Sequence, residues 1–111
     1  MYRLTLLYGQ PEDQASFEEY YHGVHVPLAL QIPGLQKFTY GQVSPDEDDS
    51  VYAIAALDWD DEASFAAGMS SPEGERARED VPRFASGGVT MLQTEIDDLL
   101  RGSSSVGAAQ P

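Results

Sequence analysis

Residues 51–57, with the sequence VYAIAAL, constrain the fold more than any other segment. The run is apolar at nearly every position and is bounded by charged residues. A strand with one face in solvent alternates apolar and polar side chains, whereas an unbroken apolar run is typical of a strand covered on both faces. We therefore expect a central strand here, with other parts of the protein packed against each face.

The rest of the chain alternates between strand and helix patterns. Period-two alternation predicts three more strands, over residues 2–8, 36–43 and 89–96. Helix signals predict a first helix over residues 13–24, a second that starts within 58–62 and ends within 68–72, and a short exposed helix over 73–78. The order predicts an α+β, ferredoxin-like βαββαβ fold, an antiparallel sheet with two helices on one face.

Two helices reach only one face of such a sheet. Leu7 and Val43 add apolar residues to the other face, beside residues 51–57. A second copy of the chain, packed sheet to sheet about a two-fold axis, would cover that face, and such dimers are the commonest oligomers. We therefore expect a homodimer joined through the sheet faces.

Composition limits the classes of partner and compartment. The 111 residues suffice for one domain, expected over residues 1–101, with a flexible tail over residues 102–111. A formal net charge of −13 argues against binding to nucleic acid or to an anionic membrane surface. The chain has no cysteine, no signal-peptide pattern and no long apolar run, so the cytoplasm is the expected compartment.

Candidate chemistry is concentrated in residues 17–35, which hold both histidines. Phe17, Tyr20, Tyr21 and Val24 recur at helical spacing and predict an aromatic stripe that faces inward. Pro27 disfavours helical geometry at the residue before it, so the helix is expected to end or kink there. His25 would then lie at a helix terminus, where a cation is favoured.

His25 is the first candidate for acid–base chemistry, because the ordinary pKa of histidine lies closest to neutrality. The alternative is a histidine that only caps the end of the helix. Tyr21, one turn earlier, either orients the imidazole and bonds a ligand or is a core residue, and the same choice holds for Tyr20.

Other groupings of polar residues favour structural interpretations. Glu18, His22 and His25 can be drawn as a metal site on one helix face, but without a third histidine or a cysteine we predict no metal. The acidic run over residues 44–49 lacks the glycine and distal glutamate of a calcium loop, so we expect a solvated loop. Trp59 either lines the mouth of a pocket or covers the edge of the core.

Two motifs resemble a known family. The sequence YYHGVHVPLALQIPGL, followed by EDVPRFASGGVT, is similar to the EthD-like proteins over residues 2–95. The resemblance implies the dimeric α+β barrel superfamily, a small-molecule pocket and no cofactor. It also brings an oxidoreductase label, an association with polyketide decarboxylation or dehydration in fungal relatives, and cofactor-free oxygenation or haem breakdown in distant ones.

Two hypotheses for function follow. In the first, the protein is a small cofactor-independent enzyme of catabolic or secondary metabolism, oxidoreductase-like or decarboxylase/dehydratase-like, that acts on a small apolar or aromatic metabolite. His25 would be its general acid or base and Tyr21 the partner of His25. In the second, it is a non-catalytic ligand-binding or accessory protein of a degradation pathway. The pocket is expected between the sheet and the first helix, with ligand-binding residues Tyr20, His22, Leu28, Trp59 and Phe84.

Overall fold

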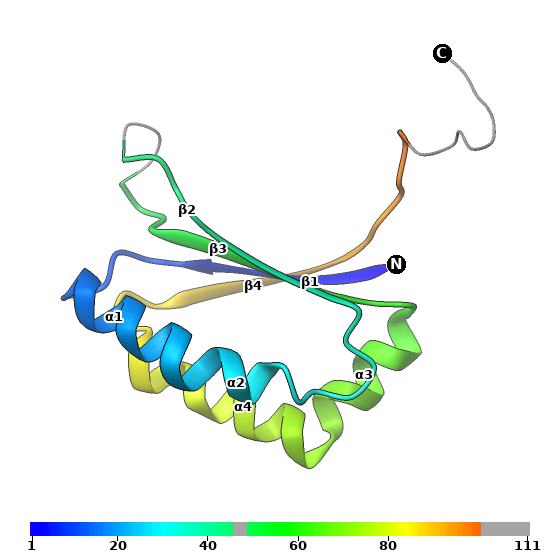
Figure 1. Ribbon diagram of the computed structural model, residues 1–111. Helices are drawn as coiled ribbons and strands as arrows, with labels where there is room; N and C mark the ends of the chain where they lie inside the picture. Colours follow the sequence, from blue (N-terminus) through cyan, green and yellow to red (C-terminus); the bar gives the residue numbers. More distant parts are fainter. Residues whose placement is uncertain (46–48, 101–111) are drawn as a thin grey trace.

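The computed structural model describes residues 1–45 and 49–100 and contains one antiparallel sheet with helices on one face (Figure 1). The strands are β1 (Tyr2–Tyr8), β2 (Lys37–Gln42), β3 (Ala53–Trp59) and β4 (Val89–Glu95), in the spatial order β2-β3-β1-β4. The helical segments are α1 (Gln14–Tyr20), η1 (Tyr21–His25), α2 (Val26–Ala29), α3 (Glu62–Ser70) and α4 (Pro72–Phe84). The predicted ferredoxin-like α+β fold is confirmed. The predicted tail, residues 102–111, and residues 46–48 of the acidic run lie outside the described residues.

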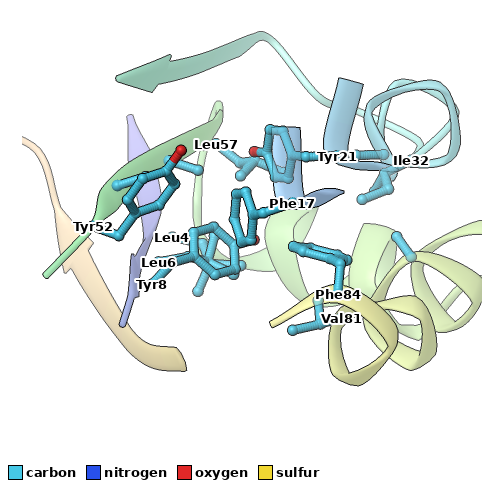
Figure 2. Packing of buried hydrophobic residues seen from close by; sticks show 14 of the residues in the cluster. Leu4, Leu6, Tyr8, Phe17, Tyr21, Ile32, Tyr52, Leu57, Val81 and Phe84 are labelled. Carbon is cyan, nitrogen blue, oxygen red and sulfur yellow. The ribbon is translucent and has the colours of Figure 1, made fainter. Parts of the chain in front are cut away.

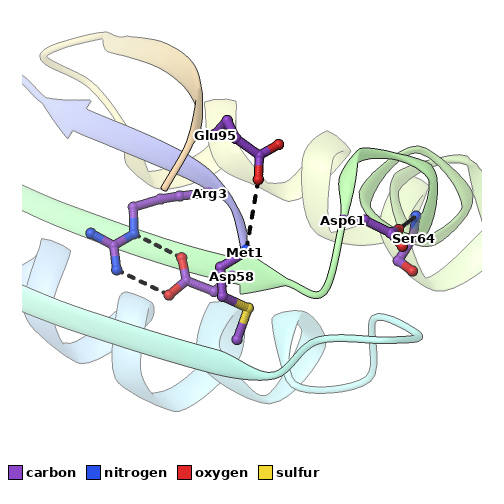
Figure 3. Close-up of polar contacts among 6 residues, drawn as sticks. All are labelled: Met1, Arg3, Asp58, Asp61, Ser64 and Glu95. Atoms are coloured by element: carbon purple, nitrogen blue, oxygen red, sulfur yellow. Dashed lines mark hydrogen bonds and ion pairs between the residues drawn. The ribbon is translucent and has the colours of Figure 1, made fainter. Parts of the chain in front are cut away.

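Strand β3 is central, as predicted, but it lies two residues later than residues 51–57. Asp58 belongs to the strand because Arg3, directly opposite on β1, binds its carboxylate with two nitrogens at 2.7 and 3.0 Å (Figure 3). Trp59 is also a strand residue, and helix α3 begins only after Asp61, whose side chain accepts a hydrogen bond from the backbone N–H of Ser64 (Figure 3).

Of the two outcomes predicted at Pro27, an end or a kink of the first helix, the end is wrong. Helix α1 continues through the π-helical turn η1 into α2, and Val26 has right-handed helical angles of φ −58° and ψ −47°. The backbone N–H of Val26 donates to the carbonyl of Tyr21, five residues back. This wider turn changes the hydrogen-bond pattern just before the proline, so the backbone stays helical through it. His25 therefore lies within a helical run, and its side chain makes no capping hydrogen bond.

The predicted short exposed helix over residues 73–78 is also wrong. Helix α4 runs from Pro72 to Phe84 and presents one buried face to the sheet. Its buried residues recur every three or four positions and are Gly74, Ala77, Asp80, Val81 and Phe84. The charged residues that suggested exposure form the opposite face of an amphipathic helix, so α4 belongs to the single helical layer that covers the sheet.

The second face of the sheet has no helix against it (Figure 1). Ile54 of β3 is 40% exposed and Leu92 of β4 is 47% exposed, although both are large apolar side chains. The expectation that two helices leave an apolar face open is thus confirmed for the single chain. Within the described residues, no helix is both long and apolar enough to cross a membrane.

Candidate functional site

A narrow pocket lies between the sheet and the helical layer, with a cavity volume of about 30 Å³ in the single chain. All four strands contribute to its lining, together with η1, α2, α3 and α4. The apolar lining residues are Leu4, Leu6, Ala29, Ile32, Phe38, Leu57, Met69, Ala77, Val81 and Met91. The lining residues with polar side-chain atoms are Tyr8, Tyr21, His25 and Arg78. The accessible lining is almost wholly apolar, so the pocket favours an apolar molecule.

His25 and Asp80 form a buried pair beside this pocket. Nδ1 of His25 lies 3.0 Å from Oδ2 of Asp80, and the two side chains are only 7% and 5% exposed. The hydroxyl of Tyr20 donates to the other carboxylate oxygen of Asp80 at 2.6 Å. Residues from η1, α1 and α4 therefore fix the orientation of the imidazole ring.

Burial lowers the pKa of His25 below its ordinary value, and Asp80 opposes that effect only in part. The imidazole is therefore neutral near pH 7, and the carboxylate beside Nδ1 favours the tautomer with its proton on Nδ1. Nε2 then carries a lone pair and has no hydrogen-bond partner among residues 1–45 and 49–100. A carboxylate behind one ring nitrogen and a free lone pair on the other is the arrangement of an oriented general base.

Tyr21 supplies a second polar group to the pocket. Its side chain is fully buried in the aromatic cluster that Figure 2 shows, stacked on Phe17, with the Tyr40 ring 4.5 Å and the His25 ring 5.4 Å from its own. Burial, followed by the neighbouring Tyr8 phenol, raises the pKa of Tyr21, so the hydroxyl stays protonated. The Tyr8 hydroxyl is a close polar neighbour, but among the described residues no hydrogen bond of normal geometry reaches the Tyr21 hydroxyl. A buried unsatisfied donor costs about 1–3 kcal/mol, and a ligand could supply the missing acceptor.

The other residues predicted to bind ligand have different surroundings. Tyr20 contacts Asp80, and Phe84 packs against the rings of Tyr21 and His25 without lining the pocket. Trp59 is fully buried and donates from Nε1 to the carbonyl of Pro33. Leu28 lines a separate hollow together with Arg76, Glu79, Asp80 and Arg83.

His22 is separated from His25 and belongs to a different polar cluster. Its Nε2 lies 3.1 Å from Oε1 of Glu18, while the hydroxyls of Tyr40 and Tyr52 both donate to Oε2 of Glu18. These contacts link helix α1 to strand β2 and to the segment before β3. In the described part of the chain, no three His, Cys, Asp or Glu side chains are grouped closely enough to hold a metal.

Sequence reasoning missed Asp80, although it proposed His25 and Tyr21, which line the pocket. Asp80 was assigned to the connection that follows a short charged helix, so it was not considered as a partner of His25. The signal that could have revealed it is the spacing of Ala77, Val81 and Phe84, which extends a helix through residue 84 and places residue 80 on its inner face.

Comparisons with known proteins identify the family. The EthD domain family matches residues 9–88. An uncharacterized 11.0 kDa protein from the thcB-thcC intergenic region of Rhodococcus erythropolis is 43% identical over 102 residues, which cover 90% of this chain and 99% of that protein.

Solved structures give the same result. An EthD family protein from Bacillus halodurans has a TM-score of 0.81 and 32% identity, and the match covers 87% of this chain and 99% of that one. A dimeric ferredoxin-like protein from Thermobifida fusca has a TM-score of 0.68 and 17% identity, with 86% and 90% covered. At that identity, the second likeness concerns the fold alone.

Proposed function

Because this chain belongs to the EthD family, we propose that it is a cofactor-independent enzyme that acts on a small apolar or aromatic metabolite in the pocket between sheet and helices. One observation carries the proposal: a buried, carboxylate-oriented imidazole lies next to a buried hydroxyl without a partner, and both residues line an apolar pocket. Buried titratable groups of this kind are common at functional sites.

The proposed chemistry is proton transfer. Nε2 of His25 takes a proton from an acidic C–H or O–H bond of the ligand, and the electron pair of that bond stays on the ligand. Asp80 stabilises the imidazolium that forms, and the Tyr21 hydroxyl donates to the oxygen on which negative charge develops. In a decarboxylase-like outcome the C–C bond to the carboxyl group breaks, carbon dioxide leaves and the proton returns from Nε2 to that carbon; in a dehydratase-like outcome the C–O bond breaks and the proton leaves with the hydroxyl as water. An oxidoreductase-like outcome needs dioxygen as a second substrate that accepts the electrons of the deprotonated ligand.

A non-catalytic role uses the same pocket. Binding alone would satisfy the Tyr21 hydroxyl and bring a hydrogen-bond donor to Nε2 of His25, so a ligand-binding or accessory protein of a degradation pathway is the second candidate. The two candidates differ in turnover, not in where the ligand lies.

We also infer a homodimer through the open face of the sheet. Ile54 and Leu92 expose apolar surface there, and the similar Thermobifida fusca protein is described as dimeric. Pairing of two such faces would remove this apolar surface from water.

The test begins with a compound retained through native purification and identified by mass spectrometry. Turnover and binding of that compound are then measured for the native protein, His25→Gln and His22→Gln. His22→Gln is the matched control, because it makes the same change at an exposed histidine outside the pocket lining. We expect a loss of turnover of about 10²- to 10⁴-fold for His25→Gln alone, the usual contribution of a positioned proton donor or acceptor.

Two results would count against the enzymatic proposal. Turnover by His25→Gln at the native rate would remove the imidazole from the chemistry. A native protein that binds the compound but never converts it would favour the accessory role, and weaker binding by His25→Gln would then still place the ligand beside this residue.

A further inference from the structure

No helix covers the open face of the sheet (Figure 1), and the residues of this face form three rows that cross all four strands. The rows arise because alternate residues of a strand share a face and the strand pairing fixes which residues lie side by side. One end row has Ile54 and Leu7 at its centre, and the opposite end row has Asp58 and Arg3 there, with Lys37 beside Asp58. Uncharged residues make up the middle row.

The two end rows differ in chemistry. Ile54 is a large apolar side chain that is 40% exposed. In the charged row, Arg3 binds both carboxylate oxygens of Asp58 (Figure 3), and the aspartate side chain is buried while the arginine side chain is half-buried. The open face is therefore apolar at one end and charged at the other, and a partner must match both ends.

Two sheets that pack face to face can be related by a two-fold axis that runs along the strands or across them. An axis along the strands keeps each row opposite the same row of the partner and reverses the strand order, so β3 lies opposite β1 of the partner. Ile54 is then opposite the partner's Leu7, and Asp58 is opposite the partner's Arg3. With this axis, each of these charges meets an opposite charge and the apolar ends meet each other.

An axis across the strands gives a different contact. It reverses the order of the rows, so the row of Ile54 and Leu7 lies opposite the charged row of the partner. The arginine and the aspartate would then lose water without gaining an opposite charge across the interface, which is unfavourable. Of the two axes, the one along the strands is the one that matches both ends of the open face.

Resting on the homodimer inferred above, we propose that its two-fold axis runs along the strands and that the Arg3–Asp58 pair fixes this orientation. Burial of the apolar ends stabilises the contact, whereas the charged rows act against the alternative orientation. The ion pair thus has a second role besides joining β1 to β3 within one protomer.

Isotope-filtered NMR tests the orientation in the native protein. The sample is a dimer of one carbon-13-labelled and one unlabelled protomer, so the nuclear Overhauser effects that are selected come from contacts between protomers. Facing sheets lie about 10 Å apart with interdigitated side chains, which brings opposed methyl groups within range. We expect effects between the methyl groups of Ile54 and those of the partner's Leu7, and none between Ile54 and the partner's Arg3.

Charge reversal tests the role of the ion pair. Arg3→Glu places like charges opposite each other twice in the symmetric dimer, so we expect its dimer dissociation constant to rise about tenfold, and the same for Asp58→Arg. An equal mixture of the two proteins should form a heterodimer of nearly native affinity, because each reversed charge then meets its complement. Lys37→Glu is the matched control, since Lys37 is in the same row but lies opposite the partner's uncharged Thr94.

The other outcomes overturn separate statements. Effects between Ile54 and the partner's Arg3 would show that the axis runs across the strands, while the dimer itself would stand. A mixture no tighter than its two parents, or an equal effect of Lys37→Glu, would remove the ion pair from the choice of orientation. A dimer without effects across the open face, or a native monomer, would overturn the open-face dimer and this inference together. None of these results bears on turnover, so the proposed acid–base chemistry is tested separately. If the reversed variants do not fold, the NMR contacts of the native protein still decide the orientation.

Discussion

Replacement of Asp80 by Asn tests the pair with His25 most directly, because an amide has nearly the shape of a carboxylate and no charge. The Tyr20 hydroxyl can still donate to the amide oxygen. The amide nitrogen then faces Nδ1 of His25 and can only donate to it, so the imidazole must accept there and carry its proton on Nε2. In that tautomer Nε2 cannot take a proton from a ligand.

The size of the effect follows from the contacts. Asp80→Asn exchanges two hydrogen bonds to a buried carboxylate, at 2.6 and 3.0 Å, for two neutral ones. Since hydrogen bonds to charged groups contribute about 1.5–3 kcal/mol and neutral ones about 0.5–1.5 kcal/mol, we expect the free energy of unfolding to fall by about 1–3 kcal/mol. Turnover of the retained compound should fall about 10²- to 10⁴-fold. The pKa of His25 should fall further, because Asp80 opposes the effect of burial.

Three measurements check this prediction. Nitrogen-15 NMR of the imidazole reports which ring nitrogen carries the proton and follows the His25 titration, denaturant unfolding gives stability, and turnover gives the chemical effect. An unchanged tautomer and an unchanged His25 titration in a folded Asp80→Asn protein would refute the reasoning. A stability loss with native turnover would mean that Asp80 only holds α4 against η1.

Three further predictions concern the buried hydroxyl, acid stability and assembly. Tyr21→Phe should raise the free energy of unfolding of the unliganded protein by about 1 kcal/mol, because it removes an unsatisfied donor. Tyr52→Phe should lower the free energy of unfolding, because it breaks a hydrogen bond to Glu18. Denaturant unfolding measures both variants, and a Tyr21→Phe protein less stable than the native one would contradict the first prediction. Burial acts to raise the pKa of Glu18, but hydrogen bonds from Tyr40, Tyr52, Gln42 and His22 outweigh it and leave the pKa lowered. The stability that Glu18 contributes should therefore be complete above its ordinary pKa and be lost as the pH falls through the lower pKa of the folded protein. Glu18→Gln should flatten the acid side of a plot of stability against pH. An unchanged acid side would argue against this network of hydrogen bonds. Ile54→Glu should give a monomer in sedimentation, because it places a charge in the proposed dimer interface. Val24→Glu is the control and should leave the dimer intact, because Val24 is equally exposed but lies on the helical side. A native protein that sediments as a monomer would contradict the dimer proposal.

Local patterns predicted most of the fold. Alternation predicted β1 because every second residue from Tyr2 to Tyr8 is buried against the helices. The apolar run over residues 51–57 predicted a central strand, but its boundary was displaced because the Arg3–Asp58 pair joins residues far apart in the sequence. A charged residue inside a strand has no local signal when its partner lies on a neighbouring strand.

The boundaries of the helices likewise depend on local sequence in part and on tertiary packing in part. Pro27 has a strong local effect on the residue before it, yet the helix continues because a π-helical turn and packing on the sheet outweigh that preference. The charged residues of α4 suggested an exposed segment, while burial of one face against the sheet made it a long helix.

By itself, the sequence determined the fold class and the family and made His25 and Tyr21 candidate site residues, because periodicity and a motif are properties of neighbouring residues. Only the tertiary structure decided the chemistry available to them. It brought Asp80 from α4 to Nδ1 of His25 and left the Tyr21 hydroxyl without a partner among the described residues. The physical reason is that the hydrogen bond to His25 and the shared pocket join residues more than fifty positions apart, and a local pattern carries no information about such pairs.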